Sequence, residues 1–276
     1  MQTEIGALRK MTAQLDAQGK VEYQLPIGEQ LIPLNELIGK PLTLTYHQHI
    51  SCSHCGRKTK KSFSQGYCYP CMQKLAQCDM CIMKPETCHF DAGTCREPEW
   101  GETNCFIPHY VYLANTSGLK VGITRHTQIP TRWIDQGATQ ALPIFKVNTR
   151  LQSGLVEIAL AEFIADKTNW RTMLKGNAEP IDLVEKSKEL IPLISEKLEA
   201  IRLKFGSDSV EQLNESIIEL NFPVEQFPTK ITSFNFDKTT EVAGILMGIK
   251  GQYLFFDTGV INIRKFSSYH IHLTVN

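Results

Sequence analysis

All nine cysteines of this 276-residue chain lie between Cys52 and Cys105, which restricts what that segment can become. The first four follow the pattern Cys52-x2-Cys55-x12-Cys68-x2-Cys71. Each CxxC knuckle turns tightly enough to present two thiolates to one ion, and Zn²⁺ takes four such ligands in a tetrahedron. Disulfides are the alternative interpretation, but the N-terminal residues show no signal peptide. The spacing therefore predicts a zinc-ribbon module.

A second group of potential ligands follows within residues 78–105. It holds five cysteines and one histidine, which is more than one zinc ion needs. The expected ligands are Cys78, Cys88 and Cys105, with Cys81, His89 or Cys95 as the fourth. The sequence thus predicts one or two structural Zn²⁺ ions and leaves the ligands of the second open.

Composition narrows the class of protein. Hydrophobic residues make up 42% and charged residues 21% of the chain, as in globular proteins, and the length allows one large domain or two to three small ones. No apolar run is long enough to span a membrane, so we expect no membrane association. Free thiols at metal-binding spacing suit a reducing compartment, most simply the cytoplasm.

The formal net charge of zero gives no overall signal for nucleic acid, but one segment is locally basic. Between the two CxxC knuckles, cations alternate with aromatic residues and no acid occurs. Such a mixture can follow a phosphate backbone and stack on bases, or it can be a solvated ribbon face. The candidate nucleic-acid contacts are Arg57, Lys58, Lys60 and Lys61.

Hydrophobic alternation with a period of two marks both ends of the chain as β-rich. We expect an N-terminal β-rich unit at 1–50 and a C-terminal one at 229–276, packed near each other or as two matched small barrels. Between them we expect the zinc module at 51–107, a small mixed core at 108–178 and a helical segment at 179–228.

Within the middle of the chain, residues 110–124 predict two strands joined by a turn at 115–118. Helices are predicted at 153–165, at 182–205 and at 208–220. Pro192 should kink or divide the second helix, and Asp208 is the expected N-cap of the third.

The strings Tyr110-Val-Tyr-Leu-Ala, Leu119-Lys-Val-Gly-Ile-Thr-Arg and Thr131-Arg-Trp resemble the GIY-YIG nuclease superfamily. The resemblance covers about residues 110–169 and implies a small antiparallel sheet with helices. It also implies a nuclease site in which Tyr112, Gly122 and Arg132 match the family's motif residues. Lys120 stands where the family has its second tyrosine, which is a departure.

The resemblance further implies a metal-binding glutamate, here Glu157 or Glu162, and a downstream asparagine, here Asn169. Helical geometry favours Glu157, because it lies at the edge of an apolar stripe whereas Glu162 faces away from it. In such a site Glu157 would hold Mg²⁺ or Mn²⁺ and Arg132 would brace a phosphate oxygen. Tyr112 would act as a base or orient water, and Lys120 would lower the pKa of Tyr112 or hold phosphate.

The whole chain also resembles a bacterial family of unknown function that combines a cysteine-rich zinc module with a GIY-YIG-like core. The strings that carry this likeness are Cys52-Ser-His-Cys-Gly-Arg-Lys, Gln65-Gly-Tyr-Cys-Tyr-Pro-Cys, Thr131-Arg-Trp-Ile-Asp-Gln-Gly and Thr168-Asn-Trp-Arg. The predicted fold class is α+β, with a zinc ribbon, this core and β-rich ends.

The leading functional hypothesis is a metal-dependent nuclease or nucleic-acid processing protein that cleaves phosphodiester bonds. The alternatives are a non-catalytic, zinc-dependent nucleic-acid-binding module and a protein-interaction adaptor that uses the acidic helical segment.

Overall fold

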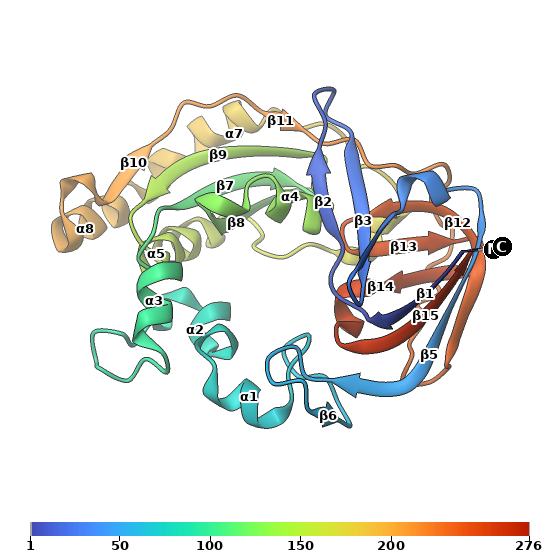
Figure 1. Ribbon diagram of the computed structural model, residues 1–276. Helices are drawn as coiled ribbons and strands as arrows, with labels where there is room; N and C mark the ends of the chain where they lie inside the picture. The colour runs from blue at the N-terminus through green and yellow to red at the C-terminus, as the bar shows by residue number, and fades with distance from the viewer. Residues whose placement is uncertain (1, 276) are drawn as a thin grey trace.

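The computed structural model describes residues 2–275 and is an α+β protein built on three antiparallel sheets (Figure 1). The largest sheet combines strands from both ends of the chain, and the pairing of Gln2 with Val275 brings the two ends together. The prediction that the β-rich ends pack near each other is confirmed. The strand order of this large sheet is β1 (Gln2–Ala7), β15 (Tyr269–Val275), β5 (Pro41–Ser51), β12 (Glu241–Lys250), β13 (Tyr253–Phe256) and β14 (Gly259–Asn262), with β6 (Lys58–Thr59) beside β5.

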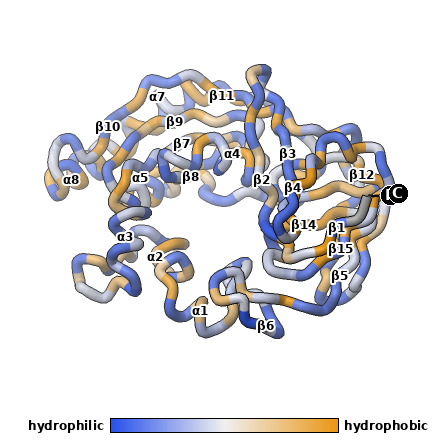
Figure 2. Tube along the Cα trace, viewed as in Figure 1, coloured by the Kyte–Doolittle hydropathy of each residue, from blue (hydrophilic) through white to orange (hydrophobic). Residues whose placement is uncertain are grey.

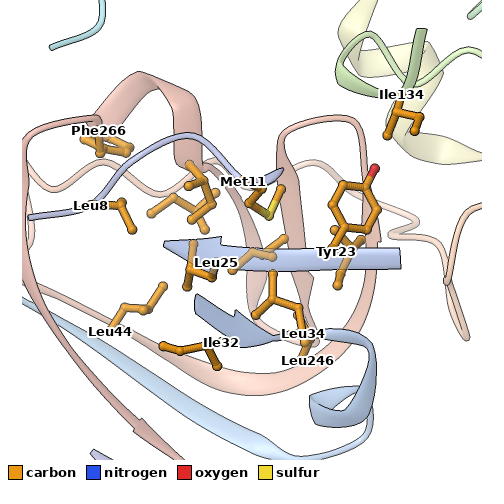
Figure 3. Packing of buried hydrophobic residues seen from close by; sticks show 14 of the residues in the cluster. Leu8, Met11, Tyr23, Leu25, Ile32, Leu34, Leu44, Ile134, Leu246 and Phe266 are labelled. Atoms are coloured by element: carbon orange, nitrogen blue, oxygen red, sulfur yellow. The ribbon is translucent and has the colours of Figure 1, made fainter. Parts of the chain in front are cut away.

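A three-stranded sheet packs with this large sheet and closes its interior. It consists of β2 (Thr12–Leu15), β3 (Val21–Ile27) and β4 (Gln30–Pro33). Alternate residues of β3 are buried, as its hydrophobic pattern predicts. Leu25 and Tyr23 of β3 belong to one buried cluster with Leu44 of β5 and with Phe266 of the turn before β15, so the two sheets share one core (Figure 3).

The third sheet carries the predicted hairpin. Strands β7 (His109–Asn115) and β8 (Leu119–Arg125) pair in register around a turn at 116–118, as expected from the sequence. Strand β9 (Gln140–Val147) pairs with the other edge of β7. Two short strands, β10 (Val210–Gln212) and β11 (Ile218–Glu219), pair with the other edge of β9. Strand β8 therefore lies at one edge of this sheet.

The two faces of the hairpin sheet enter different cores, because successive side chains of a strand point to opposite faces. Val111 and Leu113 pack against α5 (Arg150–Ala161), α7 (Leu183–Leu190) and α8 (Ser195–Phe205). Tyr112 and Ala114 instead join the core of the end sheets, together with side chains of α4 (Thr131–Asp135). The hairpin is thereby covered on both faces.

The cysteine-rich segment, residues 51–107, bridges the end sheets and the hairpin sheet (Figure 1). It holds α1 (Tyr69–Lys74), α2 (Met80–Met83) and α3 (Pro98–Asn104). One end is tied to the large sheet through the Ser53 and Ser268 hydroxyls, 2.6 Å apart. At the other end the Arg150 guanidinium donates to the Ile82 carbonyl at 2.6 Å.

Two predicted helices need correction. The helix expected at 208–220 is wrong: α8 ends at Gly206, with a φ of +103°, and the chain then forms β10 and β11. The exposed edge of β9 offers backbone groups that need partners, and this outweighs the local helical pattern. The helix expected at 153–165 covers Arg150–Ala161 instead, because Thr149 and Gln152 form a capping box that starts it earlier.

Other local features agree with the sequence. A 3₁₀ turn at Ile191–Ile194 that contains Pro192 divides the predicted 182–205 helix into α7 and α8. The remaining helix, α6 (Trp170–Lys175), follows the hairpin core. Among the residues described, no helix has the length and apolarity that crossing a membrane would require.

His109, at the start of β7, is fully buried and provides a test of the hairpin core. Burial lowers the pKa of His109 to about 4, from an ordinary value of 6.5. Between these two values the unfolded chain binds a proton that the folded protein does not. The free energy of unfolding should therefore fall as the pH falls through this window, by about 3 kcal/mol for this group.

We predict that His109→Gln, which cannot titrate there, loses less stability than the wild type between pH 7 and pH 4. Urea unfolding of both proteins at several pH values measures the difference, in which the contributions of all other groups cancel. Identical pH dependence in the two proteins would contradict the buried, neutral state of His109.

Candidate active site and metal centre

The four cysteines of the two CxxC knuckles come together as predicted. The thiol sulfurs of Cys52, Cys55, Cys68 and Cys71 all lie within 4.8 Å of one another. The Sγ atoms of Cys55 and Cys68 are 3.8 Å apart. A tetrahedral zinc with Zn–S distances of about 2.3 Å places its sulfurs about 3.8 Å apart. This four-cysteine cluster therefore has the ligand type and spacing to hold a structural Zn²⁺.

The backbone of the knuckles supports this geometry. Gly56 turns the first knuckle with a φ of +70°, and its amide donates to the Cys52 carbonyl at 2.9 Å. Burial acts to raise the pKa of the Cys52 thiol, but backbone amides that donate to the sulfur lower it to about 6. A thiolate held by amide donors is the form that zinc binds.

Four later cysteines gather around one small apolar pocket between α2 and α3. They are Cys81, Cys88, Cys95 and Cys105. Burial and then the neighbouring Asp79, Cys88, Cys105 and Cys95 raise the pKa of Cys81 to about 11. Such mutual repulsion of thiolates is what a bound cation would relieve. The four thiols thus line one pocket, although no three of their sulfurs lie within 4.8 Å of one another.

Cys78, a predicted ligand of the second zinc, lies apart from these four. Its surroundings are Ser64, Arg96 and Cys52, on the side of the first cluster. The adjacent Asp79 accepts from Arg96 Nε at 2.7 Å and lies 3.4 Å from His89 Nε2. A carboxylate oxygen of Asp79, the Cys81 sulfur and a ring nitrogen of His89 also lie within 4.8 Å of one another. The structure therefore gathers Cys81, Cys88, Cys95 and Cys105 without Cys78.

The basic residues between the knuckles form an exposed patch around β6. Figure 2 shows this stretch as strongly hydrophilic. The side chains of Arg57, Lys58, Lys60 and Lys61 are all exposed. Lys61 lies over the Phe63 ring, with its Nζ 5.3 Å from the ring centroid. The patch has the mixture of exposed cations and one aromatic ring that the sequence indicated.

In the core, Tyr112 and Gly122 face each other across the β7–β8 hairpin. A Cβ at Gly122 would lie 2.6 Å from the Tyr112 hydroxyl oxygen and 2.7 Å from Cζ. The tyrosine ring therefore lies directly over the glycine and is fully buried, edge-on to Trp133. Burial raises the pKa of Tyr112, which makes its hydroxyl a poor base.

Gln136 connects Tyr112 to Arg132. With its amide oriented to satisfy both neighbours, the Gln136 nitrogen donates to the Tyr112 hydroxyl at 2.9 Å. Its oxygen accepts from Arg132 Nη2 and Nε at 3.2 and 3.3 Å. Because Arg132 and Gln136 are four residues apart at the two ends of α4, this short helix fixes the guanidinium beside the hairpin.

Lys120 and Glu157 complete the group of predicted catalytic residues. Lys120 is only 4% exposed, and burial followed by the charge of Arg132 lowers its pKa to about 8. Burial raises the pKa of Glu157, while Lys120 and Arg132 oppose that shift. The structure thus brings Tyr112, Lys120, Arg132 and Glu157 within electrostatic reach of one another, at the β8 edge of the sheet.

The other two predicted residues have separate roles. Asn169 caps α6, where its side chain accepts from the Thr172 amide at 3.3 Å. Glu162 lies just past the end of α5 and forms an ion pair with Lys197 on α8. Glu157 as the metal-binding glutamate stays a prediction. The apolar stripe predicted on this helix was Val156, Leu160, Phe163 and Ile164. It extended too far, because α5 ends at Ala161 and Phe163 is 48% exposed.

Sequence reasoning missed three charged residues near this group. Burial lowers the pKa of Arg150, at the start of α5, and of Arg264, in the turn before β15, and the nearby charge of Arg132 lowers both further. Asp166 lies beside Lys120, because the backbone at Ala165 pairs with β8. Arg150 precedes the predicted helix and Arg264 is more than 100 residues away in the chain, so no local signal pointed to either.

The chain belongs to a family without an assigned function. The family model described as "Protein of unknown function (DUF2797)" matches residues 39–271, which is well over half of the chain. This confirms the expected membership of such a family. No curated protein and no solved structure matches the chain significantly. The GIY-YIG resemblance of the core therefore stays a prediction.

The contact between Tyr112 and Gly122 gives a direct test of the hairpin geometry. Gly122→Ala places a methyl group against the tyrosine ring, and we predict a loss of about 1–3 kcal/mol in the free energy of unfolding, as for other overpacked cores. Gly176→Ala is the control, since a Cβ there meets no atom within 4 Å and its φ of 170° is extended. Urea unfolding measures both; equal stability of the two variants would argue against the packing described.

Proposed function

We propose that this protein is a metal-dependent phosphodiesterase acting on nucleic acid, with Lys120, Arg132 and Glu157 at its reaction centre. The observation that carries the proposal is the meeting of these three side chains, from β8, α4 and α5, beside a buried tyrosine. Their order along the chain and the hairpin that presents them resemble the GIY-YIG superfamily. The zinc module would supply structure and, through its basic patch, contacts to the phosphate backbone.

Glu157 is the proposed ligand of the catalytic cation. Its carboxylate is partly buried on α5 and faces Lys120 and Arg132 rather than an ion-pair partner on its own helix. A single carboxylate with several waters is an ordinary way for proteins to bind Mg²⁺ or Mn²⁺. A hard cation at this position would activate water or stabilise the charge that develops on the leaving oxygen.

The cations around Glu157 are suited to a phosphate. Four positive groups are involved, because Arg132 lies close enough to Lys120, Arg150 and Arg264 to lower the pKa of each. Within residues 2–275, none of the four forms an ion pair at 4.0 Å or less. Grouping like charges without an ion-pair partner costs free energy, and a bound polyanion would recover it. A nucleic-acid backbone supplies phosphates at the required density.

Tyr112 has a positioning role in this proposal. Its hydroxyl is enclosed and bonded to Gln136, so it holds Arg132 through that amide instead of taking a proton from water. With a lysine in place of the second motif tyrosine, water activation rests on the metal and on Lys120. The same features favour the second candidate function, a binding module that holds nucleic acid without cleaving it.

We also propose a second structural zinc, bound by Cys81, Cys88, Cys95 and Cys105. These thiols share one pocket, and their segment between α1 and α5 forms only short helices and turns. A zinc ion would contribute folding free energy where the hydrophobic core is small. It would also hold the backbone that receives the Arg150 hydrogen bond.

Zinc content distinguishes these ligand sets. We predict that purified wild-type protein holds two zinc ions, that Cys68→Ser and Cys95→Ser each lose one, and that Cys78→Ser keeps both. Cys68→Ser should also unfold the first knuckle pair, seen as rapid hydrogen exchange in residues 52–74. Elemental analysis gives the number of zinc ions per chain. His54→Ala is the control, because the exposed His54 imidazole is not one of the proposed zinc ligands. Zinc loss from Cys78→Ser, with none from Cys95→Ser, would refute the assignment of the second site.

The catalytic proposal is tested with Mg²⁺ or Mn²⁺ and a panel of labelled DNA and RNA substrates. Glu157→Gln removes the charge but keeps the shape, and we predict that it lowers the cleavage rate by about 10²- to 10³-fold, as for loss of one preorganised charged group. Glu162→Gln, at the C-terminal end of the same helix but paired with Lys197, should retain wild-type activity.

Equal activity in the wild type and Glu157→Gln would identify a contaminant. Nucleic-acid binding without cleavage would favour the binding module. If the wild type neither cleaves nor binds, the basic patch and the cation group have another purpose and the proposal fails.

A further inference from the structure

Four of the eight histidines of the chain gather on the solvent face of the large sheet. They form two His-x-His pairs, His47-Gln-His49 on β5 and His270-Ile-His272 on β15, which are adjacent strands. The ring centroids of His49 and His270 are 4.3 Å apart, and those of His47 and His272 are 6.1 Å apart. The buried neighbour Ile271 confirms that both β15 histidines point outward.

An irregularity in β5 creates this arrangement. Tyr269 pairs with Ile50, whereas Ile271 pairs with Tyr46, so three residues of β5 lie opposite His270 alone. At the centre of the bulge, Gln48 has a φ of +54°, a conformation that residues other than glycine rarely adopt. Bulges re-aim side chains and concentrate near functional sites. Here the bulge presents two histidines of one strand to one histidine of the next.

Ser51 orients one member of the group. Its hydroxyl oxygen lies 2.7 Å from His270 Nε2, which leaves the Nδ1 of the same ring free to bind a ligand. A hydrogen bond at the second ring nitrogen is the usual companion of a metal-bound imidazole, because it fixes the ring orientation. The other three rings lie on an open face, where rotamers adjust quickly enough to close around an ion.

We infer that the His47, His49, His270 and His272 imidazoles form a surface site for a divalent transition-metal ion. Imidazole nitrogen is a ligand suited to Zn²⁺, Ni²⁺ and Cu²⁺ and a poor one for Mg²⁺ or Ca²⁺. The pair His49–His270 supplies the first two ligands, and His47 and His272 complete the set from the same face. The site differs from the thiol clusters in being open to solvent, so it suits an ion that exchanges.

A solvated row of unrelated histidines is the plain alternative. It does not account for the strained backbone at Gln48 or for the bulge that brings His47 and His49 to the same neighbour. It also gives no reason for the Ser51 hydroxyl to be fixed on His270. A metal site explains all three observations together.

The test uses zinc-loaded protein, in which the thiol clusters are saturated, titrated with Ni²⁺ by calorimetry. We expect one Ni²⁺ per chain beyond the zinc content, with the affinity falling at least tenfold in His49→Ala and in His270→Ala. Zinc measured in the dialysate shows whether Ni²⁺ has entered the thiol sites instead. His126→Ala, which removes an exposed histidine elsewhere, is the matched control and should bind as the wild type does.

All three substitutions lie at partly or fully exposed side chains, so the variants should fold; the zinc content and the unfolding temperature check this. His49→Ala serves alone if loss of the Ser51 contact destabilises the His270 variant. Ni²⁺ binding that is equally strong in the wild type and in the His49→Ala, His270→Ala double variant would overturn the inference. So would wild-type binding no tighter than that of a single exposed histidine.

Discussion

The arrangement of the molecule depends on the contacts of one buried group, the carboxylate of Asp135. It accepts hydrogen bonds from Lys10 Nζ and from Gln252 Nε2, each at 2.8 Å. The Gln252 side chain also accepts a hydrogen bond from the Met11 amide and donates one to the Met11 carbonyl. The Asp135 side chain is only 5% exposed, and a buried carboxylate without partners would be strongly destabilising. One side chain thus joins α4 to both ends of the chain.

This junction also fixes the proposed reaction centre. Asp135 and Arg132 belong to the same short helix, so the contacts of Asp135 with the end sheets determine where the Arg132 guanidinium lies. Ile134 of α4 packs among the residues of the end sheets, next to Tyr23 in Figure 3. The β-rich ends would therefore serve as the support that sets α4 against the hairpin, and Arg264 would add a cation from the same support.

Local patterns predicted local structure well, and long-range contacts explain the remainder. The hairpin at 110–124, the CxxC knuckles and the division at Pro192 follow from nearby residues. The strands at 210–219 could not be predicted, because the edge of β9 that they cover lies about 70 residues away. Similarly, Cys78 and Cys81 are equivalent candidate ligands in the sequence. Only the fold distinguishes them, because α2 turns Cys81 toward α3. The two His-x-His pairs were visible, but the bulge that unites them was not.

The central claim is that Glu157, surrounded by cations, binds a hard metal ion beside the hairpin. Paramagnetic broadening of amide NMR signals by Mn²⁺, added to zinc-loaded protein, tests it most directly without any substrate. We predict broadening confined to amides of β8, α4 and α5 around Glu157, and its loss in Glu157→Gln. Broadening that is absent there, or that persists unchanged in Glu157→Gln, would contradict the claim.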